Sequence, residues 1–123
     1  MTLYYAGMIF VIPLVASYLG RSFVRTYANR YKSILGYRSP MAKKNPDTWR
    51  VAHYVLGRTW MLLGVILGLL SGLTVFLYRQ VGPEDIEGLF VTIVALQIIS
   101  LLVAMIPTEM KLRQLFDKTG KRR

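Results

Sequence analysis

Residues 59–78, TWMLLGVILGLLSGLTVFLY, contain no Asp, Glu, Lys or Arg. An α-helix rises about 1.5 Å per residue, so a stretch of this length is long enough to cross about 30 Å of hydrocarbon. Uncharged runs of similar length occupy residues 1–20 and 88–108. We therefore predict an all-α integral membrane protein with three transmembrane helices, over about residues 2–20, 57–78 and 88–107.

The composition of the 123-residue chain fits a single membrane domain, residues 1–123. It combines 54% hydrophobic residues with a net charge of +10, and all the charges lie outside the three uncharged runs. So apolar a chain is not a disordered one, and the absence of Cys excludes a disulfide framework and a thiolate metal site. Three polar segments remain: a long loop (residues 21–56) between the first two spans, a short loop (residues 79–87) between the second and third, and a tail (residues 108–123).

The basic residues are divided unequally between the segments that flank the spans. Residues 21–58 hold nine of the 16 Lys and Arg, residues 109–123 hold six, and residues 79–87 hold one. Because basic segments stay inside, we predict a cytoplasmic loop and C-terminus, and an N-terminus outside. We expect the first run to be an uncleaved span, since no basic segment precedes it. The basic segments are expected to contact anionic lipids of the inner leaflet, not nucleic acid.

A few small or polar residues within the spans predict how the helices pack. Gly64, Gly68 and Gly72 share one helix face, on which a second helix of this chain or of another copy can approach closely. Gln97 lies near the middle of the third span and needs a hydrogen-bond partner, for which we expect a carbonyl or hydroxyl of the second span. Pro13 removes a backbone donor from the first span and predicts a kink there. No Asp, Glu, Lys, Arg or His lies within the three uncharged runs, which argues against a proton-coupled transporter.

The tail is expected to form a short amphipathic helix on the inner membrane surface, ending near Gly120. Its apolar residues recur at near-helical spacing among Lys and Arg; they are Met110, Leu112, Leu115 and Phe116. Such a helix buries its apolar face among the acyl chains while its basic side chains reach the headgroups.

The long loop contains a strong signal for the start of a helix, Asn45-Pro46-Asp47. Asn is favoured at the N-cap, Pro at the first helical position, and an acidic residue in the first turn. A helix that begins at Pro46 can continue without interruption into the second span. Trp49 and His53 are four residues apart and would then share a face of this helix.

The loop and the tail carry two blocks of sequence with a recognisable pattern. The first runs Gly36-Tyr37-Arg38-Ser39-Pro40, then Asn45-Pro46-Asp47-Thr48-Trp49-Arg50-Val51-Ala52-His53, then Gly57-Arg58, and the second is LRQLFDKTGKR at residues 112–122. Over about residues 29–65 and 107–122 the chain resembles the SdpI/YfhL family, small bacterial membrane proteins named for immunity to a secreted peptide toxin. The resemblance implies a multi-pass protein of the bacterial cell membrane.

Five residues of this motif are candidates for contact with a ligand or lipid: Gly36, Arg38, Asn45, Trp49 and His53. The Arg38 guanidinium suits a lipid phosphate, helix carbonyls or the single carboxylate of the loop. Trp49 is expected to be an anchor at the membrane interface. His53 is the only His, and we expect a hydrogen-bonded structural residue at this position.

The motifs of the chain carry no recognisable catalytic chemistry. No His, Cys, Asp and Glu residues have metal-ligand spacing, and no Ser, His and acid converge as a triad, so we expect no enzyme, metal or cofactor. Two functions remain open. One, implied by the resemblance, is immunity or resistance to a membrane-active peptide toxin. The other is an accessory subunit that packs on a larger membrane complex or forms a homodimer through its glycine face.

Overall fold

The computed structural model of the chain describes residues 3–32, 36–80 and 83–123. Their regular elements are helices: α1 (Leu3–Met8), α2 (Val11–Arg25), the 3-10 helix η1 (Tyr27–Asn29), α3 (Pro46–Leu77), α4 (Pro83–Val103) and α5 (Met105–Leu115). Parts of three predicted segments lie outside the described residues: the start of the first span at Thr2, residues 33–35 of the long loop, and residues 81–82 of the short loop.

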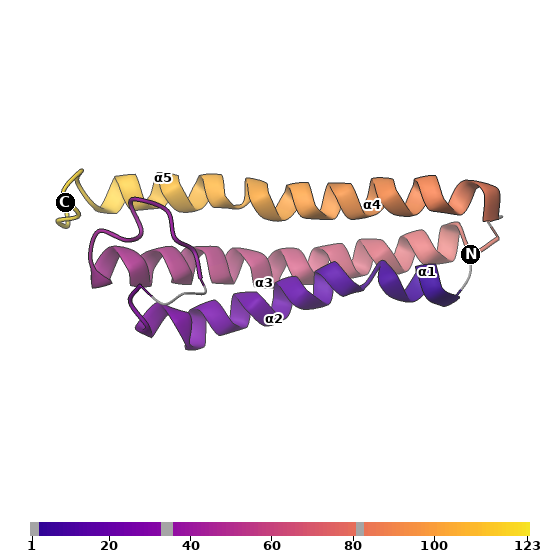
Figure 1. The fold of residues 1–123 in the computed structure, drawn as a ribbon, viewed down its shortest axis with the longest axis horizontal. Coiled ribbons are helices and arrows are strands. Elements are labelled where there is room, and N and C mark those ends of the chain that lie inside the picture. The colour runs from indigo at the N-terminus through magenta and orange to yellow at the C-terminus, as the bar shows by residue number, and fades with distance from the viewer. Residues whose placement is uncertain (1–2, 33–35, 81–82) are drawn as a thin grey trace.

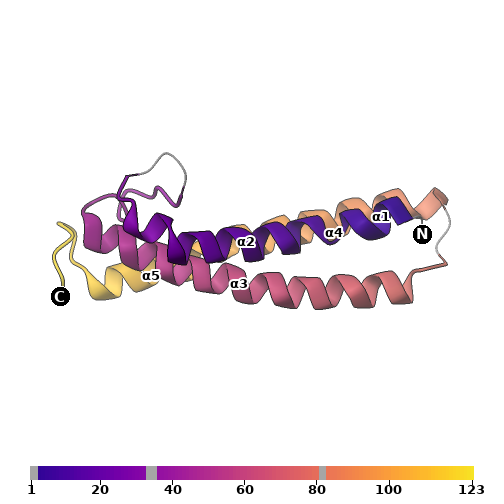
Figure 2. The ribbon, with the colours of Figure 1, turned by 90° about the horizontal axis from the view of Figure 1, so that it is seen from below.

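Three helical rods run side by side along the length of the molecule (Figure 1). They cover Leu3–Asn29, Pro46–Leu77 and Asp85–Leu115, and each is long and apolar enough to cross a membrane. Figures 1 and 2 together show that the rods form a three-cornered bundle rather than a flat layer. The predicted all-α class with three candidate spans is confirmed.

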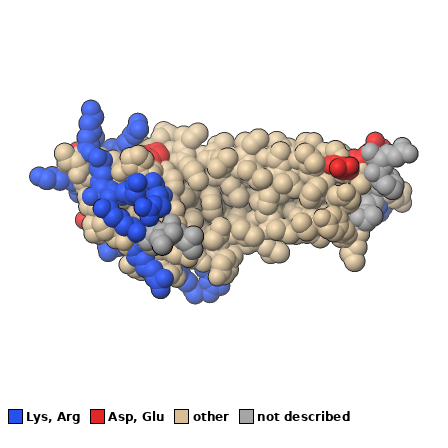
Figure 3. Space-filling view, in the orientation of Figure 1, with Lys and Arg blue, Asp and Glu red and all other residues tan. Residues whose placement is uncertain are grey.

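On the face drawn in Figure 3, the middle of the bundle shows no Lys, Arg, Asp or Glu. Large side chains such as Leu14, Leu69 and Phe76 face outward, and Leu69 is 72% exposed. Contact between water and such a continuous apolar surface is unfavourable, whereas lipid tails solvate this surface at no cost. Lys and Arg gather at the end of the bundle that holds the C-terminus, which we call the basic end (Figure 3).

The first rod is interrupted between α1 and α2, about one helical turn before Pro13, and this proline causes the break. A proline has no N–H, so the carbonyl of Ile9, four residues earlier, loses its helical partner. The side-chain amide of Gln97 on α4 replaces that partner, since Gln97 Nε2 lies 3.1 Å from Ile9 O. The same Nε2 donates to Ser71 Oγ on α3, at 3.0 Å. The expected partner on the second span is present, and a carbonyl of the first span is bound as well.

Glycines allow α2 and α3 to pack closely. A Cβ atom added to Gly64 would lie 2.0 Å from Ser17 Oγ and 2.8 Å from Pro13 O, so no larger residue fits there without movement of the backbone. Gly20 and Gly57 also pack against each other. A Cβ atom added to Gly20 would lie 2.5 Å from the carbonyl oxygen of Gly57, and one added to Gly57 would lie 2.6 Å from that of Gly20. On the predicted glycine face, Gly64 thus packs tightly against α2, whereas Gly68 and Gly72 lie in ordinary contact with Pro13 and Phe10, 3.9 Å from an added Cβ.

The third rod is divided by a second proline. Pro107 cannot donate to the carbonyl of Val103, and α4 ends at that residue. Pro107 itself lies in the first turn of α5, where a missing N–H costs little. The tail helix therefore begins at Met105 and runs on in line with α4 (Figure 1). It ends at Leu115, before the predicted end near Gly120, because Phe116 is extended.

A double-mutant cycle tests the repair of the Pro13 break. We expect Gln97→Leu to lower the free energy of unfolding by about 1 kcal/mol, because the Ile9 carbonyl is left without a donor in a membrane interior. In a Pro13→Ala background the new N–H of residue 13 can bond to Ile9 O, so Gln97→Leu should cost less there. Thermal unfolding of the four proteins in one detergent measures this coupling. If Gln97→Leu lowers the free energy of unfolding equally with and without Pro13→Ala, the Gln97 amide does not replace the missing donor of the Ile9 carbonyl.

Candidate functional site

The start of α3 is fixed by its N-cap, as Asn45-Pro46-Asp47 predicts. Asn45 Oδ1 accepts from the backbone N–H of Thr48 at 2.9 Å, and the Thr48 hydroxyl is bonded in return to Asn45 N at 3.0 Å. This reciprocal capping box satisfies donors that a helix start leaves unpaired. Asn45 Nδ2 also donates to the carbonyl of Gly120, at 2.6 Å, so the tail is joined to the beginning of α3.

Trp49 and His53 stack on each other one turn into α3. Their ring centroids are 4.3 Å apart, and both side chains are fully buried. The indole Nε1 donates to the carbonyl of Tyr27 at 2.7 Å, which ties η1 to α3. Trp49 was expected at the lipid interface, and this expectation is wrong: the ring is enclosed by protein, because η1 and Tyr31 fold over it.

His53 holds a short part of the loop, residues 36–40, against α3; we call this part the Gly36 segment. Its Nδ1 lies 2.8 Å from the Trp49 carbonyl, and its Nε2 lies 2.9 Å from the backbone N of Tyr37. The first contact requires a proton on Nδ1 and the second requires a lone pair on Nε2, so only the neutral Nδ1–H tautomer satisfies both. Gly36 has φ +125°, and a Cβ there would lie 2.6 Å from His53 Nε2. Glycine suits both the backbone conformation and the close approach.

Tyr37 connects the same segment to α5. Its buried hydroxyl donates to Glu109 Oε1, 72 residues later in the chain. Burial raises the pKa of the Tyr37 hydroxyl, and the hydrogen bond to Glu109 raises it further, so the phenol stays protonated. Neither Tyr37 nor Glu109 was singled out from the sequence; the position of Tyr37 inside the Gly36–Pro40 motif was the available signal.

The structure brings four of the five motif residues into one assembly, which we call the basic-end lock. It comprises Gly36, Asn45, Trp49 and His53, with Tyr37, Glu109 and Gly120 as their partners. Arg38 is exposed beside it and lies 3.5 Å from the Lys32 carbonyl. In the described part of the chain no group of three or more His, Cys, Asp or Glu is placed to hold a metal ion. The lock supplies packing and hydrogen bonds that join the loop, α3, α5 and the tail.

Replacing His53 by Phe tests the lock, because Phe keeps a ring of similar size but accepts no hydrogen bond. We expect the buried Tyr37 N–H, left without a partner, to cost about 1–3 kcal/mol of stability. The loop should also be cut faster by trypsin at Lys32 and Arg38. The matched control is Tyr54→Phe, since Tyr54 is the neighbouring residue and is exposed. Identical melting and cleavage of the two variants would contradict a holding role for His53.

The comparisons with known proteins bear on this assembly. The family model described as the SdpI/YfhL protein family matches residues 29–108, a segment that includes the Gly36 segment, α3 and α4. Searches of curated proteins and of solved structures found no match. The matched segment is well over half of the chain, and the chain belongs to the SdpI/YfhL protein family.

Proposed function

We propose that this chain is a non-enzymatic membrane protein that gives its cell immunity or resistance to a membrane-active peptide toxin. Membership of the SdpI/YfhL family carries the proposal, because the family is named for immunity of this kind. The three apolar rods support it, because they are long and apolar enough to lie in the lipid bilayer, where a membrane-active peptide also acts.

A groove between α3 and α4 is the surface that we propose for contact with such a peptide. It has a volume of about 440 Å³, and its walls combine leucines and an isoleucine with a row of polar side chains. The lining residues are Leu67, Leu70, Ser71, Thr74, Ile93, Leu96, Gln97 and Ser100. Gln97 lies near the middle of its span, so the groove is at the depth that an inserted helix would reach.

The polar chemistry of this groove favours hydrogen-bond donors. The hydroxyls of Ser71, Thr74 and Ser100 each donate to a carbonyl of their own helix, at 2.7–2.8 Å. Each oxygen can also accept hydrogen bonds, and Ser71 Oγ already accepts one from Gln97 Nε2. Among the described residues, Gln97 Oε1 is a buried side-chain oxygen without a partner. A helical peptide with hydroxyl, amide or indole donors on one face would complement these acceptors.

The alternative function is an accessory subunit of a larger membrane complex. The glycine face suggested it, and on that face Gly64 packs closely against α2 of the same chain, whereas Gly68 and Gly72 are contacted less closely. Purification of the tagged chain in a mild detergent separates the two functions. A stoichiometric second protein that survives size-exclusion chromatography would favour the subunit.

Survival under peptide challenge tests the proposed function. We expect deletion of the gene to sensitise its host to at least one membrane-active peptide in a panel, and expression of the chain in a sensitive bacterium to raise the inhibitory concentration several-fold. The control is the same vector with an early stop codon in the gene. Unchanged sensitivity of both hosts across the panel would refute immunity as the function.

A pair of substitutions on α4 tests the groove. Ser100→Phe adds a ring inside the groove and should abolish protection, because the peptide is excluded. Ile99→Phe adds a ring at the next position, which is 54% exposed and does not line the groove, and should leave protection intact. Inhibitory concentrations are compared at equal amounts of protein in the membrane. Full protection with Ser100→Phe would exclude the groove as the contact surface.

A further inference from the structure

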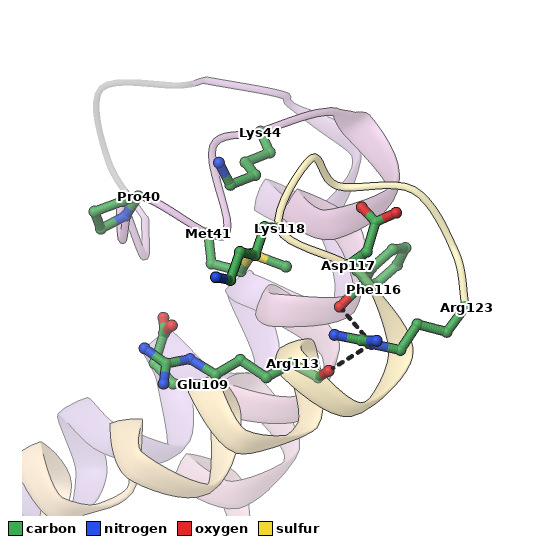
Figure 4. A pocket seen from close by; sticks show the side chains of 9 residues that line it. All are labelled: Pro40, Met41, Lys44, Glu109, Arg113, Phe116, Asp117, Lys118 and Arg123. Atoms are coloured by element: carbon green, nitrogen blue, oxygen red, sulfur yellow. Dashed lines mark hydrogen bonds between the residues drawn. The ribbon is translucent and has the colours of Figure 1, made fainter.

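A second cavity, of about 490 Å³, opens at the basic end of the bundle (Figure 4). We call it the basic pocket. The segment after Pro40, the last turns of α5 and the tail form its walls. Its lining residues are Pro40, Met41, Lys44, Glu109, Arg113, Phe116, Asp117, Lys118 and Arg123. Four of them are cationic and two are acidic.

Both acidic residues of the basic pocket are committed to other groups. Glu109 accepts the hydrogen bond of the Tyr37 hydroxyl. Asp117 Oδ1 accepts from the hydroxyl and the backbone N–H of Thr119 and from the N–H of Lys121, at 2.6–3.0 Å. The Thr119 hydroxyl, followed by the Lys121 N–H, lowers the pKa of Asp117, so this carboxylate stays ionised and holds the turn of the tail. The pocket keeps an excess of positive charge.

The cations come from three different segments of the chain. Lys44 approaches from the loop, Arg113 from α5 and Lys118 from the tail, and all three are exposed (Figure 4). Arg123 is held in place, since its Nε donates to the carbonyls of Arg113 and Phe116 at 3.0 and 3.1 Å. Guanidinium and ammonium groups that line one cavity suit a phosphate oxyanion.

An apolar groove of about 300 Å³ adjoins the basic pocket on α5. Met105, Ile106 and Met110 line it, together with the Glu109 and Arg113 that also line the pocket. The two cavities therefore share a wall, with apolar side chains toward α4 and charged ones toward the tail. A ligand that fills both carries an anionic head and a hydrocarbon chain.

The depth of the two cavities matches the layers of a bilayer. The predicted span from Gly88 to Pro107 holds 20 residues, which rise about 30 Å as a helix, close to the thickness of the hydrocarbon core. Met105 and Ile106 lie at the end of this span, level with the part of the acyl chains nearest the headgroups. Glu109 and Arg113 lie about 3 and 9 Å beyond Pro107 along α5, at the depth of the headgroups.

We propose that the basic pocket binds the phosphate of an anionic phospholipid, whose acyl chain lies in the adjoining groove. Arg113, Lys118 and Lys44 contact the phosphate, and Met105, Ile106 and Met110 contact the chain. This is a defined site for one lipid, different from the diffuse attraction between a basic surface and an anionic membrane. It does not depend on the proposed immunity function.

Native mass spectrometry of the detergent-solubilised full chain tests the site. Added phosphatidylglycerol should be retained as one molecule per chain, whereas phosphatidylcholine, which has no net charge, should not. Inorganic phosphate at the same concentration should fail to displace the lipid, because it has no chain for the groove. Equal retention of phosphatidylcholine, or ready displacement by inorganic phosphate, would overturn the proposal.

Paired substitutions separate the site from general basicity. Arg113→Gln with Lys118→Gln should weaken phosphatidylglycerol binding by about tenfold or more, since two charges near the phosphate are removed. Lys111→Gln with Arg50→Gln removes two exposed charges that do not line the pocket, and should leave binding unchanged. Melting of both double variants in phosphatidylcholine shows that they are folded. Equal weakening in the two pairs, or none in either, would contradict a defined site.

Discussion

The amide of Gln97 makes hydrogen bonds to both of the other spans at once. Pro13 leaves the Ile9 carbonyl without its helical partner, and a membrane interior holds no water that could replace that partner. Gln97 Nε2 reaches that carbonyl and Ser71 Oγ together, so the three rods are in register at this depth. Lipid tails provide no hydrophobic force to press helices together, and a polar contact of this kind defines their relative position.

The basic-end lock does at the end of the bundle what Gln97 does in its middle. It works with buried polar groups that each have one complementary partner: a carbonyl for Trp49 Nε1, a backbone N–H for His53 Nε2, and a carboxylate for the Tyr37 hydroxyl. Between these two points the glycines of α2 and α3 allow backbone contact. The outer faces remain free for lipid, and the α3–α4 groove and the basic pocket are the two concave features that we assign to ligands.

The spans and the start of α3 were predictable because the separation of charge and the Asn45-Pro46-Asp47 cap are local signals. The environment of Trp49 was not, because it depends on η1, a segment 20 residues earlier that folds back over the ring. The start of α5 was also missed, since a proline can end one helix or lie in the first turn of the next. The sequence showed that Gln97 needs a partner, but Ile9 becomes that partner only when Pro13 and the packing of α4 are considered together.

The contact between Asn45 and Gly120 has a consequence for the synthesis of the protein. The two residues are 75 positions apart, and Glu109, the partner of Tyr37, is also made late. At 5–20 residues per second, Asn45 leaves the peptidyl-transferase centre about 4 to 15 s before Gly120 does. Throughout that interval the first two spans can insert and pair, and the loop between them can contact α3, but it lacks its contacts with α5 and the tail. The loop gains these contacts only after Glu109 and Gly120 have been made, so a product that ends before Glu109 lacks both of them.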